Sequence, residues 1–240
     1  SDVIFNDDGT KMYVPDNNTG YVYQYSLSTA FDVSSASYLN YYVSGVTAQS
    51  MSFNNDGTKL FLLTANQIRE YTVSTAFDTS STVSLTTYTS LSSQESAMTG
   101  FAFNNDGTKM FTVGYNNDKV YEYALSTAFD VSSSSLSFTD SLSISSQEQI
   151  PTEIRFNLDG TKMYITGNEG RDINEYTLST AFDISSTVTH KGSYSLVSSD
   201  SYPTGFSFNN DGTKLFTTGS SFDRVNEHSL TSPFSLVDVS

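Results

Sequence analysis

The sequence contains no cysteine and no tryptophan, and it has only 11 basic residues against 26 acidic ones. Without cysteine the chain forms neither a disulfide framework nor a thiolate nucleophile, which is compatible with an oxidising or a reducing compartment. The net charge of −15 argues against nucleic acid and anionic membranes as partners, because both attract lysine and arginine. No run of about 18 apolar residues is present, so we expect no membrane insertion. An acidic surface suits solubility or the attraction of cations, and we favour solubility because surface charge usually serves solvation.

One sequence, Phe-Asn-x-Asp-Gly-Thr-Lys followed by two large apolar residues, occurs five times in the chain. The copies begin at Phe5, Phe53, Phe103, Phe156 and Phe208, so their spacings are 48, 50, 53 and 52 residues. A period of about 50 residues, with four short strands in each unit, is typical of the blades of a β-propeller.

The third copy shows how a unit is built. Residues 99–103 alternate large and small side chains, as a half-buried strand does, and the Asn-Asn-Asp-Gly turn at 104–107 leads into a return strand at 109–113. A third strand is predicted at 120–125 and a fourth, serine-rich strand at 135–144. Four antiparallel strands in this order form one blade.

The sequence therefore predicts an all-β fold, a five-bladed β-propeller of four-stranded antiparallel blades in a single domain, residues 1–240. The blades are expected at approximately 1–48, 49–98, 99–151, 152–203 and 204–240. The Phe that opens each repeat should pack between neighbouring blades, where its burial contributes on the order of 2–3 kcal/mol. Small residues would let the inner strands crowd around the axis: Ser52, Ala102, Ser207, Gly100 and Gly205.

The turns resemble those of a known repeat family. Asn-Asn-Asp-Gly at 54–57, 104–107 and 209–212 stands where WD40-like, YVTN-type propeller repeats have Ser-Pro-Asp-Gly, with an apolar strand on either side. The Ser-Thr-Ala-Phe-Asp connection, as at 126–130, is also similar to repeat arrays of bacterial surfaces and phage particles. The resemblance covers the whole chain and implies the propeller fold, which enzymes, lectins and scaffolds share.

The fifth unit is too short to repeat the others, so the last blade is open to question. Its connection is altered to Thr-Ser-Pro-Phe-Ser at 231–235, and only ten residues follow Leu230. Either 234–239 forms a shortened outer strand, or the last blade has three strands, or the chain is part of a longer one; we expect the shortened strand. Ring closure should then rest on packing between the first and fifth blades, because no outer strand precedes Asp2.

Binding sites in propellers usually lie where variable loops are held around the axis by rigid blades. Here the loops after each second strand differ between copies, and their side chains suit hydrogen bonding and stacking against sugars. The candidate ligand-binding residues are Asn17, Tyr21, Asn66, Tyr115, Asn117, Asp118, Asn168, Arg171, Asp172, Phe222, Asp223 and Arg224. The alternative is that these residues form ordinary polar turns.

Other recurring groups are expected to be structural. A carboxylate on each third strand lies too far from the axis to converge on a cation or sugar, so we expect these groups to be solvated or paired within their blades. They are Glu70, Glu122, Glu175 and Glu227, with Gln24 in the first unit. The Asn-x-Asp-Gly-Thr turn is followed at once by lysine, which argues against a calcium loop. His190 and His228 lack a nucleophile or a ligand set, so we predict no metal, cofactor or catalytic residue.

Acidic residues on the inner strands are few: Asp2 and Glu153, with Arg155 nearby. A propeller glycosidase would need two carboxylates about 5–10 Å apart near the axis. The repeat is kept in all five units, which favours equivalent sites or a scaffold over one catalytic site. A metal or a perturbed acid cluster on the axis would instead favour an enzyme.

The leading hypothesis is therefore a non-enzymatic binding or display module of a cell surface, virion or extracellular space, with weak, lectin-like recognition of glycans. The second is a structural or protein-interaction scaffold in a larger assembly such as a tail, fibre or adhesin. The third is a hydrolase or lactonase-like enzyme. No secretory leader precedes Ser1, so any signal is expected to have been removed or to lie outside these residues.

Overall fold

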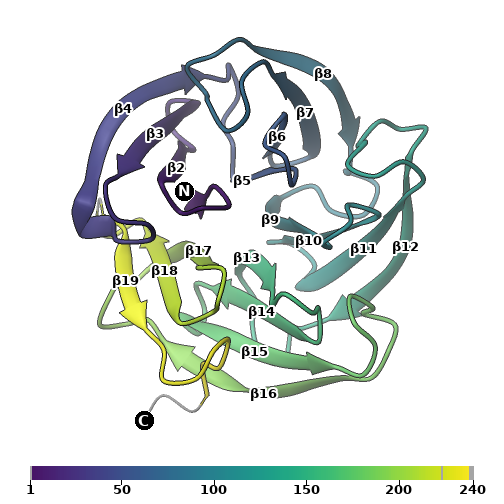
Figure 1. Ribbon diagram of the computed structural model, residues 1–240. Coiled ribbons are helices and arrows are strands. Elements are labelled where there is room, and N and C mark those ends of the chain that lie inside the picture. The colour runs from purple at the N-terminus through teal and green to yellow at the C-terminus, as the bar shows by residue number, and fades with distance from the viewer. Residues whose placement is uncertain (1, 223, 238–240) are drawn as a thin grey trace.

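Antiparallel sheets form a ring around a central axis, which confirms the five-bladed β-propeller (Figure 1). The computed structural model describes residues 2–222 and 224–237. Four sheets have four strands that neighbour one another in chain order, and the fifth sheet has three described strands. The N-terminus lies near the centre of the ring, where the first strand of each blade runs (Figure 1).

The strands divide among the blades as follows. Blade 1 contains β1 (Ile4–Phe5), β2 (Lys11–Asp16), β3 (Tyr21–Leu27) and β4 (Ala36–Val43), with the single short 3-10 helix η1 (Val33–Ser35) among the described residues. Blade 2 contains β5 (Ser50–Phe53), β6 (Lys59–Leu63), β7 (Gln67–Val73) and β8 (Val83–Ser90). Blade 3 contains β9 (Met98–Phe103), β10 (Lys109–Gly114), β11 (Lys119–Leu125) and β12 (Leu136–Ser143). Blade 4 contains β13 (Pro151–Phe156), β14 (Lys162–Gly167), β15 (Asp172–Leu178) and β16 (Val188–Ser195). Blade 5 contains β17 (Pro203–Phe208), β18 (Lys214–Gly219) and β19 (Asn226–Ser229).

The repeated turn between the first two strands is held by its own side chains. In blade 3 the Oδ1 of Asn104 accepts a hydrogen bond from the backbone N–H of Lys109 at 2.9 Å. Gly107 has a φ of +71°, and a Cβ at this position would lie 2.3 Å from the ring of Phe129. Glycine is therefore needed both for the left-handed backbone and for the Phe of the connection that covers the turn.

The recurring glutamates of the third strands join neighbouring blades. In blade 3 the carboxylate of Glu122 accepts from Lys109 Nζ of its own blade at 2.7 Å and from the backbone N–H of Ile184 in blade 4 at 3.1 Å. Lys109 also donates to the carbonyl oxygen of Phe182 in blade 4 at 2.8 Å. The predicted pairing within each blade is confirmed for the four glutamates, and the carboxylates also reach across to the next blade. The corresponding contacts involve Glu70 with Val131, Glu175 with Leu236, Glu227 with Val33, and Gln24 with Thr79.

The ring closes through the same contacts that join the other blades. The Oε2 of Glu227 in blade 5 accepts from the backbone N–H of Val33 in blade 1 at 3.2 Å, and the ring centroids of Phe5 and Phe216 are 4.4 Å apart. This confirms closure by packing between the first and fifth blades, and it confirms that the repeat-opening Phe packs on its neighbour. The other pairs of this kind are Phe53 with Tyr13, Phe103 with Phe61, Phe156 with Phe111, and Phe208 with Tyr164.

The prediction of a shortened outer strand at 234–239 is wrong for its described part, 234–237, which is not a strand. These residues instead repeat the connection of the other blades: Phe234 has a φ of +53°, as Phe129 has +54°. The backbone N–H of Leu236 bonds to Glu175 of blade 4 at 2.8 Å, so this stretch is used to lock the preceding blade. Residues 238–240 lie outside the described residues.

Candidate functional site

The inner strands place two successive sets of equivalent residues around the axis. In alignment with the repeat, the first set is Asp2, Ser50, Gly100, Glu153 and Gly205. The second set, two residues further along each strand, is Ile4, Ser52, Ala102, Arg155 and Ser207. Blade 4 therefore departs from the repeat twice, because it carries a large ionisable residue where most other blades have a small one.

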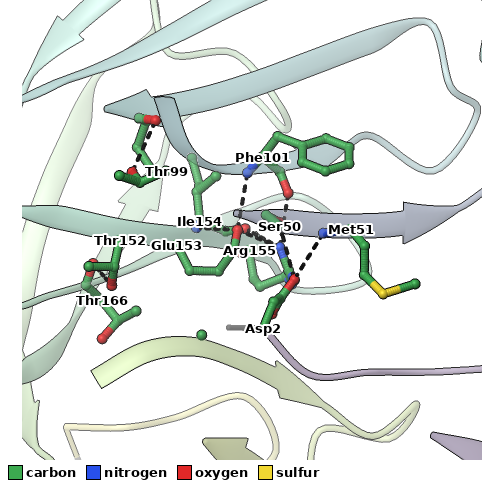
Figure 2. A network of polar contacts seen from close by, with 12 residues as sticks. Asp2, Ser50, Met51, Thr99, Phe101, Thr152, Glu153, Ile154, Arg155 and Thr166 are labelled. Atoms are coloured by element: carbon green, nitrogen blue, oxygen red, sulfur yellow. Dashed lines mark hydrogen bonds and ion pairs between the residues drawn. The ribbon is translucent and has the colours of Figure 1, made fainter. Parts of the chain in front are cut away.

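These departures meet in one polar cluster on the axis (Figure 2). Arg155 Nη2 lies 2.7 Å from Asp2 Oδ2, and Arg155 Nη1 lies 2.7 Å from Glu153 Oε1. Arg155 Nη1 also donates to the carbonyl oxygen of Phe101 in blade 3 at 2.9 Å. Ser50 Oγ of blade 2 donates to Asp2 Oδ2 at 3.1 Å. The cluster thus joins side chains and backbone from four blades.

Burial and charge set the ionisation of this cluster. Burial raises the pKa of Glu153 well above its usual value; the guanidinium of Arg155 opposes this rise, and the carboxylate of Asp2 adds to it. Burial disfavours the charged form of Arg155, but Asp2 and Glu153 outweigh it and raise the Arg155 pKa. Glu153 Oε2 is buried and has no hydrogen-bond partner among the described residues. A buried carboxyl with a raised pKa is the kind of group that acid–base chemistry uses.

Gly100 makes room for the cluster. A Cβ at Gly100 would lie 2.5 Å from the Glu153 Cα and 2.7 Å from its Oε1, so any side chain there would displace β13 or the carboxyl. The sequence predicted this small residue for strand crowding, and the structure confirms the close approach of β9 and β13. That the space left by Gly100 is occupied by the Glu153 side chain was not predicted.

A cavity of about 330 Å³ lies on the axis at the end where the first and second strands turn. The five repeat-opening Phe residues and the following Asn residues line it, together with Arg155 and Asp7. Asp2 and Glu153 are 0% exposed, whereas the Arg155 side chain is 15% exposed, so Arg155 is the residue of the cluster that lines the cavity. Asp7 is exposed to solvent overall, and partial desolvation of its carboxyl, followed by the charge of Asp8, raises its pKa.

The predicted loop residues lie at the opposite end of the blades, because they follow the second strand rather than the first. Asn17, Phe222 and Arg224 line one cleft of about 520 Å³ between blades 5 and 1. The other described candidates are distributed around the ring. Four of them contact residues near their own loops: Tyr21 stacks on Tyr41, Asn117 bonds to Glu95, Arg171 lies over Tyr202, and Asp172 bonds to Asn174. Tyr115 is exposed. Asn66, Asp118 and Asn168 belong to turns. Asp223 lies outside the described residues.

A set of buried acids that the sequence reasoning missed holds these loops. Glu148 Oε1 accepts from the backbone N–H of Glu169 at 3.1 Å, and Asp200 Oδ2 accepts from that of Phe222 at 3.2 Å. Glu95 makes the same kind of contact with Asn117. The acids stand at one position of the loop that leads into blades 3, 4 and 5, which is the signal that could have identified them.

Metal-binding clusters and membrane-spanning helices were sought in the described ranges 2–222 and 224–237. No group of three or more His, Cys, Asp or Glu residues there could hold a metal ion. No helix in that part of the chain is long and apolar enough to cross a membrane.

No protein-family model matches this sequence, and no curated protein matches it significantly. Solved structures do match. A candidate 6-phosphogluconolactonase from Bacteroides fragilis is similar with a TM-score of 0.59 at 12% identity, over 95% of this chain and 79% of that chain. A second candidate 6-phosphogluconolactonase, from Bacteroides uniformis, has a TM-score of 0.56 at 11% identity. The match covers 95% of the present chain and 65% of the Bacteroides uniformis chain. The Cps50 (Swd1) β-propeller domain of Myceliophteria thermophila has a TM-score of 0.54 at 12% identity, over 96% and 97% of the two chains. At these identities the matches establish the propeller fold.

The names of these neighbours overturn the leading prediction, a non-enzymatic, lectin-like display module. Two of the similar structures are named as candidate lactonases, which agrees with the third hypothesis and not with the first. The physical reason for the error lies in blade 4. The prediction relied on a repeat kept in all five units, but Glu153 and Arg155 break the repeat at the axis, where they build a perturbed acid cluster.

Proposed function

We propose that this protein hydrolyses small cyclic esters of the sugar-lactone class in its axial cavity. The proposal rests on the Asp2–Arg155–Glu153 cluster, which lies beside that cavity at the meeting point of four blades. The names of the similar structures suggest the substrate class. A cavity of about 330 Å³ is within the size range of small-molecule sites.

Arg155 supplies the charge that the reaction needs. Arg155 lines the cavity, and Asp2 and Glu153 fix its guanidinium. Nη2 has two N–H groups, of which one donates to Asp2, and the other would donate a hydrogen bond to a lactone carbonyl oxygen. Such a prepositioned donor stabilises the negative oxygen that forms when water attacks the carbonyl carbon. Asp2 and Glu153 act here as positioning residues.

Asp7 is the group in the same cavity that suits a general base. Its raised pKa moves the carboxylate towards the strength needed to take a proton from water. The hydroxide formed adds to the carbonyl carbon, the ring C–O bond breaks, and the proton passes from Asp7 to the alkoxide that leaves. The product is the open-chain hydroxy acid.

The test uses D-glucono-1,5-lactone and follows acid release in a pH-stat, with the rate in buffer subtracted. We expect catalysed hydrolysis, and Arg155→Lys should lower kcat/KM by about 100-fold because a lysine lacks the fixed fork of donors. Arg171→Lys, the same substitution in a loop at the opposite end of the blades, is the matched control and should leave the rate unchanged.

Since Arg155 holds two buried carboxylates, its replacement can also unfold the protein, so a second variant is needed. Ser52→Phe fills the cavity from blade 2, at a residue that makes none of the contacts of the cluster. It should abolish hydrolysis while circular dichroism remains that of the parent protein. A parent rate equal to that of buffer, or full activity in both variants, would refute the proposal.

A further inference from the structure

Blade 5 differs from the others along its outer edge. Its third strand, β19, spans Asn226–Ser229, whereas the third strand of each other blade has seven residues and pairs with a fourth strand. Among the described residues no strand pairs with the outer side of β19. The Glu227 side chain is 24% exposed, against 7% for the equivalent Glu122, which reflects the missing cover.

The backbone groups that face this open edge can be identified. The N–H of Leu230 bonds to Thr213 beside β18 at 2.8 Å, and successive residues of a strand direct their N–H and C=O groups to alternate sides. The N–H and C=O groups of Glu227 and Ser229 therefore face away from β18. In blade 3 the equivalent residues, Glu122 and Ala124, pair with the outer strand β12.

A side chain on the same edge also lacks a partner. The Nδ2 of Asn226 is buried and has no hydrogen-bond partner among the described residues. In the equivalent residue of blade 4, Asn174, the Nδ2 donates to Asp172 Oδ1 of its own strand at 3.0 Å, and the Oδ1 lies 3.0 Å from the Nε2 of His190 on the outer strand β16. At the position of Asn226, blade 4 therefore has one contact from its own strand and one from its outer strand.

The cleft of about 520 Å³ between blades 5 and 1 is where such a strand would insert a side chain. Between blades 4 and 5 the seventh residue of the outer strand, Tyr194, pairs with Ile173, and its ring lies 6.0 Å from that of His228. The residues equivalent to Ile173 and His228 at the next interface are Val225 and Tyr25, and both line the cleft. The cleft therefore corresponds to the seventh side chain of an outer strand that the described part of the chain does not supply to blade 5.

We propose that the open edge of β19 and the adjoining cleft bind an extended segment of a partner polypeptide, which pairs antiparallel with β19 as a fourth strand. The four outer strands of this chain define its chemistry: about eight residues, rich in serine, threonine and tyrosine, nearly uncharged, apolar at the first position and with a tyrosine or leucine favoured at the seventh. A second copy has no outer strand to donate, because every described outer strand is already paired in its own blade.

The probe is a fluorescent peptide with the sequence of residues 187–196, which includes the β16 strand of the neighbouring blade. We expect saturable binding by fluorescence anisotropy, and slower hydrogen exchange at the amides of Glu227 and Ser229. Ser229→Pro removes an outward N–H but no bond to β18, and should weaken binding at least about tenfold. Ser229→Ala is the matched control and should bind as the parent does. A peptide carrying Tyr194→Ser should bind more weakly, because it leaves the cleft empty.

Binding equal in Ser229→Pro and Ser229→Ala would overturn the proposal, as would no binding up to about 1 mM peptide. Unchanged affinity of the Tyr194→Ser peptide would overturn the assignment of the cleft. Light scattering on the protein alone completes the test: a dimer that the peptide fails to dissociate would show that a second copy covers this edge and would refute a strand from a partner.

Discussion

The contact between Glu122 and the next blade predicts that two substitutions of one residue will differ in their effect on stability. Glu122 accepts from the Lys109 ammonium and from the buried backbone N–H of Ile184. Glu122→Gln keeps an oxygen for the N–H and loses the ion pair, whereas Glu122→Ala loses both. Blade 1 already contains the amide form: Gln24 Oε1 accepts from the backbone N–H of Thr79 at 2.8 Å.

The magnitudes follow from the exposure of the partners. The Lys109 side chain is 32% exposed, so losing its charge partner should cost only about 1 kcal/mol of the free energy of unfolding. A buried N–H without an acceptor adds about 1–3 kcal/mol, and the cavity left by the alanine adds further. We therefore expect a loss of about 1 kcal/mol for Glu122→Gln and about 3 kcal/mol or more for Glu122→Ala.

Equilibrium unfolding in urea measures both losses, provided that the slopes of the parent and the variants agree. The same pair of substitutions at Glu95, a buried acid in the segment leading into blade 3 that accepts from Ala97 and Asn117, controls for burial without a contact to blade 4. Equal losses for Glu122→Gln and Glu122→Ala would refute the reasoning, because the ion pair and not the bond to blade 4 would then dominate.

Two further predictions concern a glycine and a buried acid. Gly160→Ala should lower the free energy of unfolding in urea by about 1–3 kcal/mol more than Gly45→Ala does. Both glycines have a φ near +70°, but only at Gly160 would a Cβ lie against a ring, 2.1 Å from Phe182. Equal losses for the two variants would contradict the packing argument. Burial raises the pKa of Glu153 well above 4.5, its usual value in the unfolded chain. Between these two pKa values the folded protein binds more protons than the unfolded chain, so the folded state loses stability as the pH rises. Glu153→Gln should flatten the fall of Tm between about pH 5 and 7, and an unchanged slope would contradict a raised pKa.

The architecture could be predicted because it depends on local residue preferences that recur in every repeat. The turn at Asn104 and Gly107 uses residues whose backbone preferences are strong, and five copies at one spacing leave few alternatives to a propeller. The contact of Glu122 with Ile184 was not predictable, because a backbone N–H as partner leaves no mark on the sequence.

The axial site was visible only in part. Asp2, Glu153 and Arg155 stood out as ionisable residues on inner strands, but Arg155 and Asp2 are separated by 153 residues, and the way the ring brings them together depends on closure. The raised pKa of Glu153 depends on its complete burial, which follows from the approach of β9 at Gly100. Local patterns do not report such distances across the axis.

The direction of the contacts between blades has a consequence for how the chain folds. The connection of each blade locks the blade before it, so blade 1 holds blade 5 through Val33 and Glu227, which are 194 residues apart. During synthesis the first four blades can dock as they emerge, whereas Val33 remains without its partner Glu227 until the fifth blade has been made. The final blade then completes two interfaces at once, one through Leu236 and one through Glu227. Closing so long a loop is slow, and we expect an open arc of four blades as the last intermediate before the ring forms.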